Sequence, residues 1–192
     1  MRQSRPPPLA AHLVLQVERA RSVSMTDEPQ KIDPIRPTDD DARALGRNLI
    51  DHARFGAIAV TDPDTQSPSV TRIAVGTTPD GAPVTLISDL SSHTTALRAN
   101  PRCSLLLGEP GPKGDPLTHP RITLDCNAVF LLKGEDGYDA LRDHYLKTHP
   151  KSKLYIDFLD FNFVLFDVID ARLNGGFGKA FRLTPTDLGH TP

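Results

Sequence analysis

The sequence contains no tryptophan, only two cysteines, and no large excess of charge of either sign. Cys103 and Cys126 cannot make a disulfide framework, and neither has metal-ligand spacing around it. Each lies in an apolar run, so we interpret both as buried free thiols, which favours a cytoplasmic location. The net charge of −2 argues against nucleic acid as a partner, because no basic field covers the molecule.

Long apolar runs are also missing. No segment approaches the ~20 apolar residues that a membrane-spanning helix needs, so we expect no membrane partner. The basic N-terminus has an apolar patch, but polar residues interrupt it and no clear cleavage site follows, which argues against a signal peptide. We expect residues 1–38 to be a disordered or arm-like extension, with Met25 as a candidate start. A single domain is expected over 39–184, followed by a tail over 185–192.

Short apolar and β-branched segments alternate with turn signals along this domain. Sequential strands joined by tight turns favour an antiparallel sheet that closes into a small barrel, in a mainly β member of the α+β class. Pro79-Asp80-Gly81 predicts a hairpin between the second and third strands. The expected strands are 56–62, 69–78, 83–89, 103–109, 121–133 and 161–174, and the expected helices begin at 39–41 and cover 91–101, 134–150 and 154–159.

A glycine-rich segment, NGGFGKAFRL (174–183), has a composition typical of phosphate-binding loops. Its glycines miss the dinucleotide-binding spacing, and a strand follows them instead of a helix. We therefore interpret Gly175, Gly176 and Gly178 as a turn or bulge between two strands, where positive φ or close backbone approach is needed.

The segment SDLSSHTTALRANP (88–101) is a better candidate for an anion site. Hydroxyl residues precede a predicted helix start, where unpaired N–H groups and a partial positive charge favour a phosphate. An ordinary capped helix with an exposed His93 explains the same pattern, so both interpretations stay open. The candidate ligands are Ser88, Ser91, Ser92, His93, Thr94 and Thr95.

Several segments, taken together and in their order along the chain, resemble the FMN-binding split-barrel family, the pyridoxamine 5'-phosphate oxidase-like proteins. The resemblance is strongest to the haem-utilisation branch of that family. The resemblance runs over 42–183, most of the expected domain. The segments that carry it are GAIAVTDP (56–63), SVTRIAVGTTPDGAPVTLISDLSSHT (69–94), LRANPRCSLLLGEPG (97–111), GDPLTHPRITLDCNAVFLL (114–132), YLKTHPKSKLYIDFLDFNFV (145–164) and ARLNGGFGKAFRL (171–183).

The resemblance implies a homodimer that holds FMN in two clefts at the interface. It implies an antiparallel split β-barrel with flanking helices, and cofactor contacts from both chains. For Arg121 a surface salt bridge is an equal alternative. The implied contacts are Thr71, Arg72, Ile73 and Ala74 along the flavin, Ile87 and Ser88 at the ring edge, Ser92, His93 and Thr94 on the phosphate, and Arg121 and Lys179 near the cleft.

Two departures from the family pattern bear on function. Related proteins often carry basic residues or Asn just after the phosphate-loop serine, whereas Thr94, Thr95 and Ala96 follow His93 here. Fewer positive charges are therefore available to bind a phosphate. Pyridoxamine-phosphate oxidases use a tryptophan-containing C-terminal segment for substrate, and this chain has no tryptophan, which argues against vitamin B6 oxidation.

Three functions remain open on this reading. The leading hypothesis is an FMN-dependent oxidoreductase with a small-molecule substrate and no catalytic side chain that can be named. Haem binding or degradation is the second, resting on the branch resemblance and on the histidines His119, His144, His149 and His190. The third is a non-catalytic flavin carrier or ligand sensor.

Overall fold

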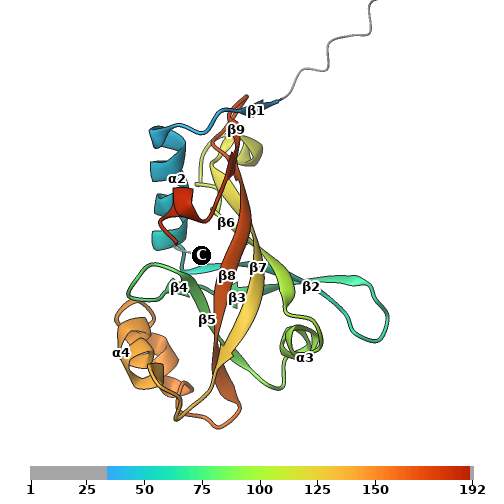
Figure 1. The fold of residues 1–192 in the computed structure, drawn as a ribbon, viewed down its shortest axis with the longest axis vertical. Helices are drawn as coiled ribbons and strands as arrows, with labels where there is room; N and C mark the ends of the chain where they lie inside the picture. Colours follow the sequence, from blue (N-terminus) through green and yellow to red (C-terminus); the bar gives the residue numbers. More distant parts are fainter. Residues whose placement is uncertain (1–33, 191–192) are drawn as a thin grey trace, which may run out of the picture. The chain divides into compact units, whose positions relative to one another are not determined.

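The computed structural model describes residues 34–190, and the account below concerns these residues (Figure 1). The expectation of a disordered extension over 1–38 falls mostly outside them. Nine strands make one sheet: β1 Ile35–Arg36, β2 Phe55–Thr61, β3 Pro68–Ala74, β4 Gly76–Thr77, β5 Pro83–Ser88, β6 Arg102–Leu107, β7 Arg121–Leu131, β8 Phe161–Asn174 and β9 Ala180–Leu183.

Three α-helices flank the sheet, so the predicted mainly β, α+β class is confirmed. They are α2 Asp40–Asp51, α3 Ser92–Ala99 and α4 Tyr138–Thr148, with 3-10 turns η1 Pro116–Thr118, η2 Pro150–Leu154 and η3 Thr186–Leu188. As the acidic run predicts, α2 starts there, because the Asp39 carboxylate accepts the Ala42 N–H at 2.8 Å. The helix expected over 154–159 is wrong, since the helical turn lies earlier, at η2.

The strands follow the order β1-β9-β8-β7-β6-β2-β3, and β5 pairs with β8 while β4 pairs with β5. All these pairings are antiparallel except β1 with β9, which confirms the antiparallel prediction. The predicted hairpin differs in detail, because the segment 69–78 turns at Val75. Its first part pairs with β2 and only Gly76 and Thr77 pair with β5. The sheet is therefore curved and split, and its hydrogen-bond ladder does not close.

The sheet separates two apolar clusters. The larger cluster fills the inside of the barrel with side chains such as Ile58, Leu105 and Leu124, each 0% exposed, and both α2 and α3 pack on it. The smaller cluster lies under α4, where Tyr138 and Tyr145 pack on Phe163 with ring centroids 5.3 Å apart in each pair. This second cluster covers the side of β5 and β8 that faces away from the barrel interior, where α4 lies (Figure 1).

The C-terminal segment was expected to be a tail from residue 185 onward. Instead η3 packs on the domain, with the Leu188 side chain 0% exposed. Arg47 of α2 donates a hydrogen bond to the Leu188 carbonyl. Asp187 binds Arg43 Nε at 2.7 Å. The segment up to His190 is thus part of the folded body, because α2 supplies both its apolar and its ionic partners.

Candidate functional site

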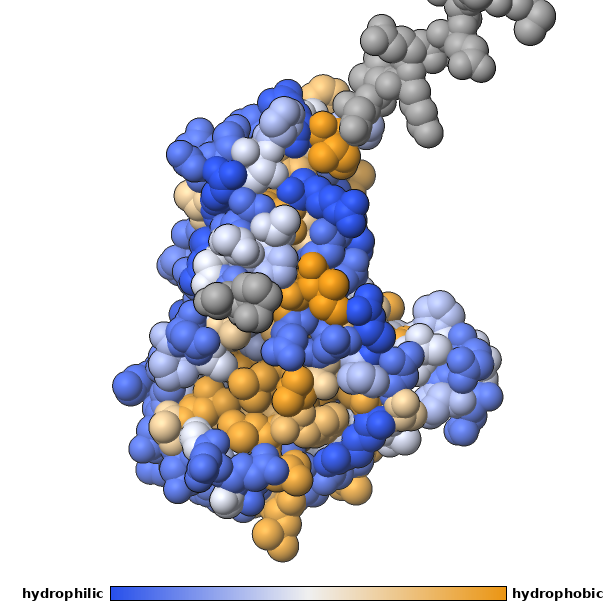
Figure 2. All heavy atoms as spheres, in the orientation of Figure 1, coloured by the Kyte–Doolittle hydropathy of each residue, from blue (hydrophilic) through white to orange (hydrophobic). Residues whose placement is uncertain are grey.

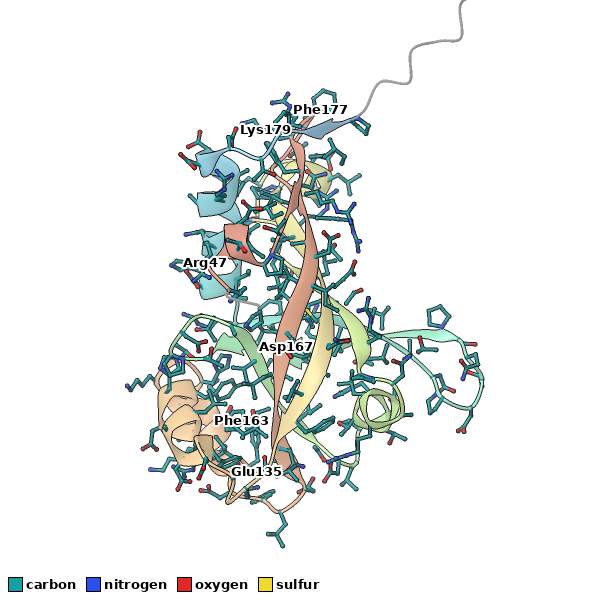
Figure 3. All side chains as sticks on the ribbon, in the orientation of Figure 1. Arg47, Glu135, Phe163, Asp167, Phe177 and Lys179 are labelled. Carbon is teal, nitrogen blue, oxygen red and sulfur yellow. The ribbon has the colours of Figure 1, made fainter. Side chains whose placement is uncertain are left out.

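The predicted cofactor residues fall into two groups at opposite ends of the long strands. Residues of β3, β5 and α3 lie near the end where Ser88 pairs with Phe161. Arg121 pairs with Asn174 at the other end, beside the turn that carries Lys179. The two ends of β8 are 13 residues apart (Phe161 to Asn174), which is about 40 Å along the strand at ~3.3 Å per residue. Figure 3 shows Lys179 and Phe177 at the far end of β8 from Phe163.

The strand predicted to follow the flavin is an edge strand with two different faces. Ile73 points into the core and is 5% exposed, whereas Arg72 is exposed on the outer face. The Val75 N–H donates to the Arg54 carbonyl, so Val75 directs its main-chain groups toward β2. Because alternate residues of an antiparallel strand bond to the same neighbour, the main-chain groups of Val70 and Arg72 point the other way, to the open edge. A ligand at this edge therefore meets main-chain donors and acceptors as well as the Arg72 guanidinium.

Further along the same edge, a main-chain group of β3 already has a hydrogen-bond partner within the chain. The Ala74 carbonyl accepts a hydrogen bond from Thr85 Oγ1 at 2.6 Å, and Thr85 is 0% exposed. Ile87, predicted to touch the ring edge, is 5% exposed and belongs to the barrel core. The open part of the β3 edge is thus short and lies toward α3.

Ser88 is the centre of the connection between β5 and α3. Its hydroxyl donates to Asp160 Oδ2 at 2.5 Å and accepts the Leu90 N–H at 3.1 Å. Its carbonyl accepts the Thr94 hydroxyl at 2.7 Å, and Thr94 is 1% exposed. Both predicted hydroxyl ligands are therefore engaged in holding the turn that starts the helix.

The first turn of α3 offers the groups that remain. Ser91 is the N-cap residue and its side chain makes no capping hydrogen bond, while Ser92 is exposed. His93 Nδ1 lies 3.1 Å from Thr71 Oγ1, and its Nε2 is buried without a partner among the described residues. Burial lowers the pKa of His93, which keeps the ring neutral near pH 7. His93 thus joins the helix start to β3 and brings no cation.

Two carboxylates stand beside this helix start, and sequence patterns gave no sign of their proximity. Asp89 binds Arg98 at 2.7 Å and Asn162 at 3.1 Å, and its N–H donates to the Asp160 carbonyl. Arg98 itself lies over the Phe130 ring, 4.2 Å from its centroid. An anion at the start of α3 would therefore need more positive charge than these residues leave free.

At the other end, Arg121 and Lys179 have different surroundings. The Arg121 guanidinium donates to the Leu117 carbonyl at 2.9 Å and the His119 carbonyl at 3.3 Å. Those contacts replace the surface salt bridge that was the alternative for Arg121. Lys179 is exposed at the end of the glycine turn, where no ion pair is found for it among the described residues.

A cavity of about 550 Å³ lies elsewhere, and none of the predicted cofactor residues lines it. It lies between the β4–β5 turn, the middle of β8 and the C-terminal segment, with Asp80, Asp167, Leu165 and His190 on its walls. A second cavity of about 340 Å³ shares Leu165 and continues toward α4. Figure 2 shows apolar residues gathered on the lower half of this face. The sequence around Asp80 predicts only a turn, and no pattern links Asp80 to His190.

The histidines considered for haem differ in how free their ring nitrogens are. His119 Nδ1 accepts the Gly111 N–H, and its Nε2 donates to the Lys113 carbonyl. His149 lies 3.1 Å from the Arg54 carbonyl and stacks on Tyr145 with centroids 4.3 Å apart. His190 Nε2, in contrast, is buried with no partner among residues 34–190. Of these rings, His190 is the one that combines a free nitrogen with a cavity wall.

Neither a metal cluster nor a membrane helix is found in the part of the chain that the structure describes. No group of three or more His, Cys, Asp or Glu side chains there is placed to hold a metal ion. No helix within residues 34–190 is long and apolar enough to cross a bilayer.

These features define a split-barrel protein with a candidate site at the β3 edge and the start of α3. The family described as "CREG, beta-barrel" matches residues 37–188, and the chain belongs to this family. The predicted resemblance to split-barrel proteins and their haem-utilisation branch is thereby confirmed.

Named relatives include haem proteins. The chain is 39% identical over 104 residues to the non-canonical heme oxygenase HOZ, chloroplastic, of Arabidopsis thaliana. The matched region is 53% of this chain and 30% of that protein. A solved heme binding protein from Mycobacterium smegmatis is 27% identical with a TM-score of 0.69, over 81% of this chain and 61% of that one. The chain thus spans less than two thirds of either relative.

A structure described as related to general stress protein 26 shares the fold. A protein of the pyridoxinephosphate oxidase family from Clostridium acetobutylicum has a TM-score of 0.58 at 12% identity, over 79% of this chain and 99% of that one. This likeness shows the fold alone.

Proposed function

We propose that two copies of this chain enclose a flat, conjugated cofactor with an anionic end, and that FMN is the first candidate. The observation that carries the proposal is the open edge of β3 beside the hydroxyl-bearing start of α3. Ser92 and the main-chain N–H groups of the first turn of α3 would hold the FMN phosphate, and Arg72 would supply positive charge. The ring fits along the main-chain groups of Val70 and Arg72.

In this arrangement the protein binds, orients and controls access to the cofactor. FMN, when bound, supplies the redox chemistry of its ring system. Arg72 places a forked guanidinium on the outer face, 5.3 Å above the Phe55 ring, where it can meet an oxygen acceptor. His93 holds Thr71 and the helix start together. Within residues 34–190, His93 bonds to Thr71 and Asp160 bonds to Ser88, so both serve the turn; we assign no catalytic side chain and propose an oxidoreductase with a small-molecule substrate.

We propose a homodimer to account for the separation of the two residue groups. Because Arg121 and Lys179 lie at the far end of β8, they can join the β3 site only from a second chain. Apolar side chains on the outer sheet face support such pairing, since Val70 is 66% exposed and Leu106 and Val129 are each 45% exposed.

The flavin assignment is tested by replacing Arg72, Ser92 and His93 together with alanine. We expect the flavin absorbance of the purified or FMN-titrated protein to fall strongly. The matched control, Ser67→Ala with Lys147→Ala, removes an exposed hydroxyl and an exposed cation outside the cleft and should leave binding unchanged. Unchanged flavin binding in the triple variant would overturn the assignment. Turnover of NAD(P)H by the loaded protein would then separate an oxidoreductase from a carrier.

Haem is the second candidate, and the named relatives support it at least as well as FMN. The specific observation is His190 Nε2, buried and unpartnered on the wall of the 550 Å³ cavity. A neutral imidazole nitrogen of this kind is a haem-iron ligand, and burial lowers the pKa of His190 toward the neutral form.

A hemin titration tests this candidate. We expect a Soret shift of defined stoichiometry that His190→Ala abolishes and that the exposed control His52→Ala retains. A shift that survives His190→Ala would remove His190 as the ligand, and no shift in the wild type would remove haem.

A further inference from the structure

The β4–β5 turn, the middle of β8 and the C-terminal segment border a space that is separate from the β3 edge. The cavity of about 550 Å³ lies here, and the cavity of about 340 Å³ lies beside it toward α4. Thr78, Asp80 and Leu165 line both cavities, so the two form one continuous space, which we call the Asp80 groove. Small-molecule sites typically measure roughly 300–1,000 Å³, and the groove is of that size.

Carboxylates line both parts of the Asp80 groove. Asp167 of β8 lines the larger cavity, and Asp136, in the turn before α4, lines the smaller one. Asp80 joins the two parts because it lines both. Figure 3 shows Asp167 near the middle of β8. No lysine or arginine is among the described residues that line either cavity, so the walls are negatively charged.

These carboxylates are not neutralised by neighbouring cations. The salt bridges found among residues 34–190 all use other aspartates. Arg47 lies close to the groove, since a Cβ atom at Gly189 would be 3.1 Å from its Nη1, but it donates to the Leu188 carbonyl and pairs with Asp51 at 3.6 Å. The Thr78 hydroxyl lowers the pKa of Asp80, which keeps that carboxylate ionised near pH 7.

The rest of the wall is apolar apart from one imidazole. Val168 lines the larger cavity, Leu141 lines the smaller one, and Leu165 lies between them. His190 lines the larger cavity, and its Nε2 is buried without a partner within the described part of the chain. Burial lowers the pKa of His190, so its ring is neutral, and Nε2 accepts a hydrogen bond when the ring proton is on Nδ1.

The distribution of these groups restricts the ligand. A bare metal ion needs several ligands around one point, and no group of three or more His, Cys, Asp or Glu side chains in residues 34–190 is placed to hold one. An acidic ligand would bring further negative charge to a wall that already carries three carboxylates. A molecule whose positive charges are separated by an apolar chain matches both the carboxylates and the wall between them.

We propose that the Asp80 groove binds a linear organic cation with two or more ammonium groups, that is, a di- or polyamine. Its methylene chain lies on Leu165, and its ammonium groups face Asp80 and the carboxylates of Asp136 and Asp167. An ammonium group and a carboxylate form a charge-assisted hydrogen bond, which is about twice as strong as a neutral one. His190 Nε2 accepts one further hydrogen bond from the ligand.

This inference is independent of the flavin assignment, because none of the residues predicted to contact FMN lines the groove. It does concern the cavity that carries His190, so a polyamine and a haem bound there would exclude each other.

Calorimetric titration of the full chain with spermidine at low ionic strength tests the ligand class. We expect saturable binding of one spermidine per chain. Butylamine, which has a similar apolar chain but one ammonium group, should bind about tenfold more weakly or worse. Absence of saturable binding, or butylamine binding as tightly as spermidine, would overturn the inference.

Two matched pairs of variants test the location. Ala140 is exposed on α4 and lines the smaller cavity, so Ala140→Lys adds a cation to the wall, whereas Ala140→Gln adds a side chain of similar length without charge. Both new residues are good helix formers, so both variants should fold. We expect spermidine binding to weaken about tenfold in Ala140→Lys and to stay within about twofold in Ala140→Gln. Equal affinities of the two variants would place spermidine elsewhere and refute the proposal.

The second pair separates the groove from the general charge of the surface. Asp136 and Asp139 are both exposed near the start of α4, but only Asp136 lines the groove. We expect Asp136→Asn to weaken spermidine binding about threefold and Asp139→Asn to leave it unchanged. Equal weakening would mean that spermidine responds to the diffuse field of the chain, which also overturns the inference.

Hemin distinguishes the two occupants considered for this cavity. With a polyamine in the groove, saturating spermidine should suppress any Soret shift that depends on His190. A Soret shift that His190→Ala abolishes but saturating spermidine leaves intact would assign the groove to haem and contradict the inference. Saturable spermidine binding without any Soret shift in the wild type would remove the haem candidate and support the polyamine.

Discussion

Replacing Asp187 by asparagine should loosen the C-terminal segment from α2. The Asp187 carboxylate accepts the Thr184 N–H at 2.8 Å, the Arg43 Nε–H at 2.7 Å and the Thr184 hydroxyl at 2.7 Å. These bonds, with the Thr184 N–H first, lower the pKa of Asp187 from 3.8 to about 2. The carboxylate therefore holds the turn that brings Leu188 into the core.

The magnitude follows from this pKa. One pKa unit is worth about 1.36 kcal/mol, so a fall from 3.8 to about 2 corresponds to about 2.4 kcal/mol. Solvent screening reduces this figure, because the Arg43 side chain is 40% exposed even though Asp187 is only 18% exposed. We expect Asp187→Asn to lower the free energy of unfolding by about 1–2 kcal/mol at pH 7.

The pH dependence has a definite sign. A carboxyl group with a lowered folded-state pKa stabilises the protein fully above its unfolded value and loses that contribution as the pH falls through the folded value. The wild type should thus lose this contribution between about pH 4 and pH 2, and the difference from Asp187→Asn should vanish at the acid end.

Urea denaturation at several pH values measures both effects. The control is Asp64→Asn in the exposed β2–β3 turn, which should change stability by less than about 0.5 kcal/mol. An Asp187→Asn protein as stable as the control at pH 7, or a difference that persists below pH 2, would show that the Asp187 carboxylate does not hold the C-terminal segment.

Three further predictions concern Gly81, the two cysteines and Asp160. Gly81→Ala should destabilise the protein by about 1–3 kcal/mol in urea denaturation, because φ is 90° and the new Cβ would lie 2.6 Å from Arg47 Nη2. Cys103 and Cys126 should react with maleimide only after unfolding, since burial raises the pKa of both thiols, to about 12 for Cys103. Asp160→Asn keeps an acceptor for the Ser88 hydroxyl but removes a charge near the start of α3, so FMN titration should show binding about two- to fivefold tighter. Weaker binding would contradict the placement of the anion there.

Much of the fold was predictable because local chemistry and tertiary structure agree. The acidic run before α2 caps that helix, and the β-branched segments became strands within a few residues of their predicted ends. The break at Val75 was not predictable, because the alternation of 69–78 continues through it. Residues 68–74 pair with β2, whereas Gly76 and Thr77 pair with β5. This change of partner depends on how the whole sheet curves and not on the local sequence.

The candidate site was predictable only in part, for a related reason. Sequence patterns placed hydroxyls at the start of α3, and the structure keeps Ser92 available there. They could not show that Ser88 is bound to Asp160, 72 residues later in the chain, or that His93 meets Thr71. Such contacts depend on which strands become neighbours, and β5 lies next to β8 rather than next to β3 along its length.

The charges at the two ends of the sheet are complementary, which is consistent with the proposed dimer. One end combines a helix start with two carboxylates, and its nearest cation is bound to one of them. The other end carries the exposed lysines Lys113 and Lys179 and the exposed apolar side chains of Leu117 and Phe177. An anion placed at the helix start would meet two carboxylates there, which is unfavourable. Because a two-fold axis can bring the unlike ends of two chains together, it satisfies both at once and creates two equivalent clefts, which a single chain cannot do.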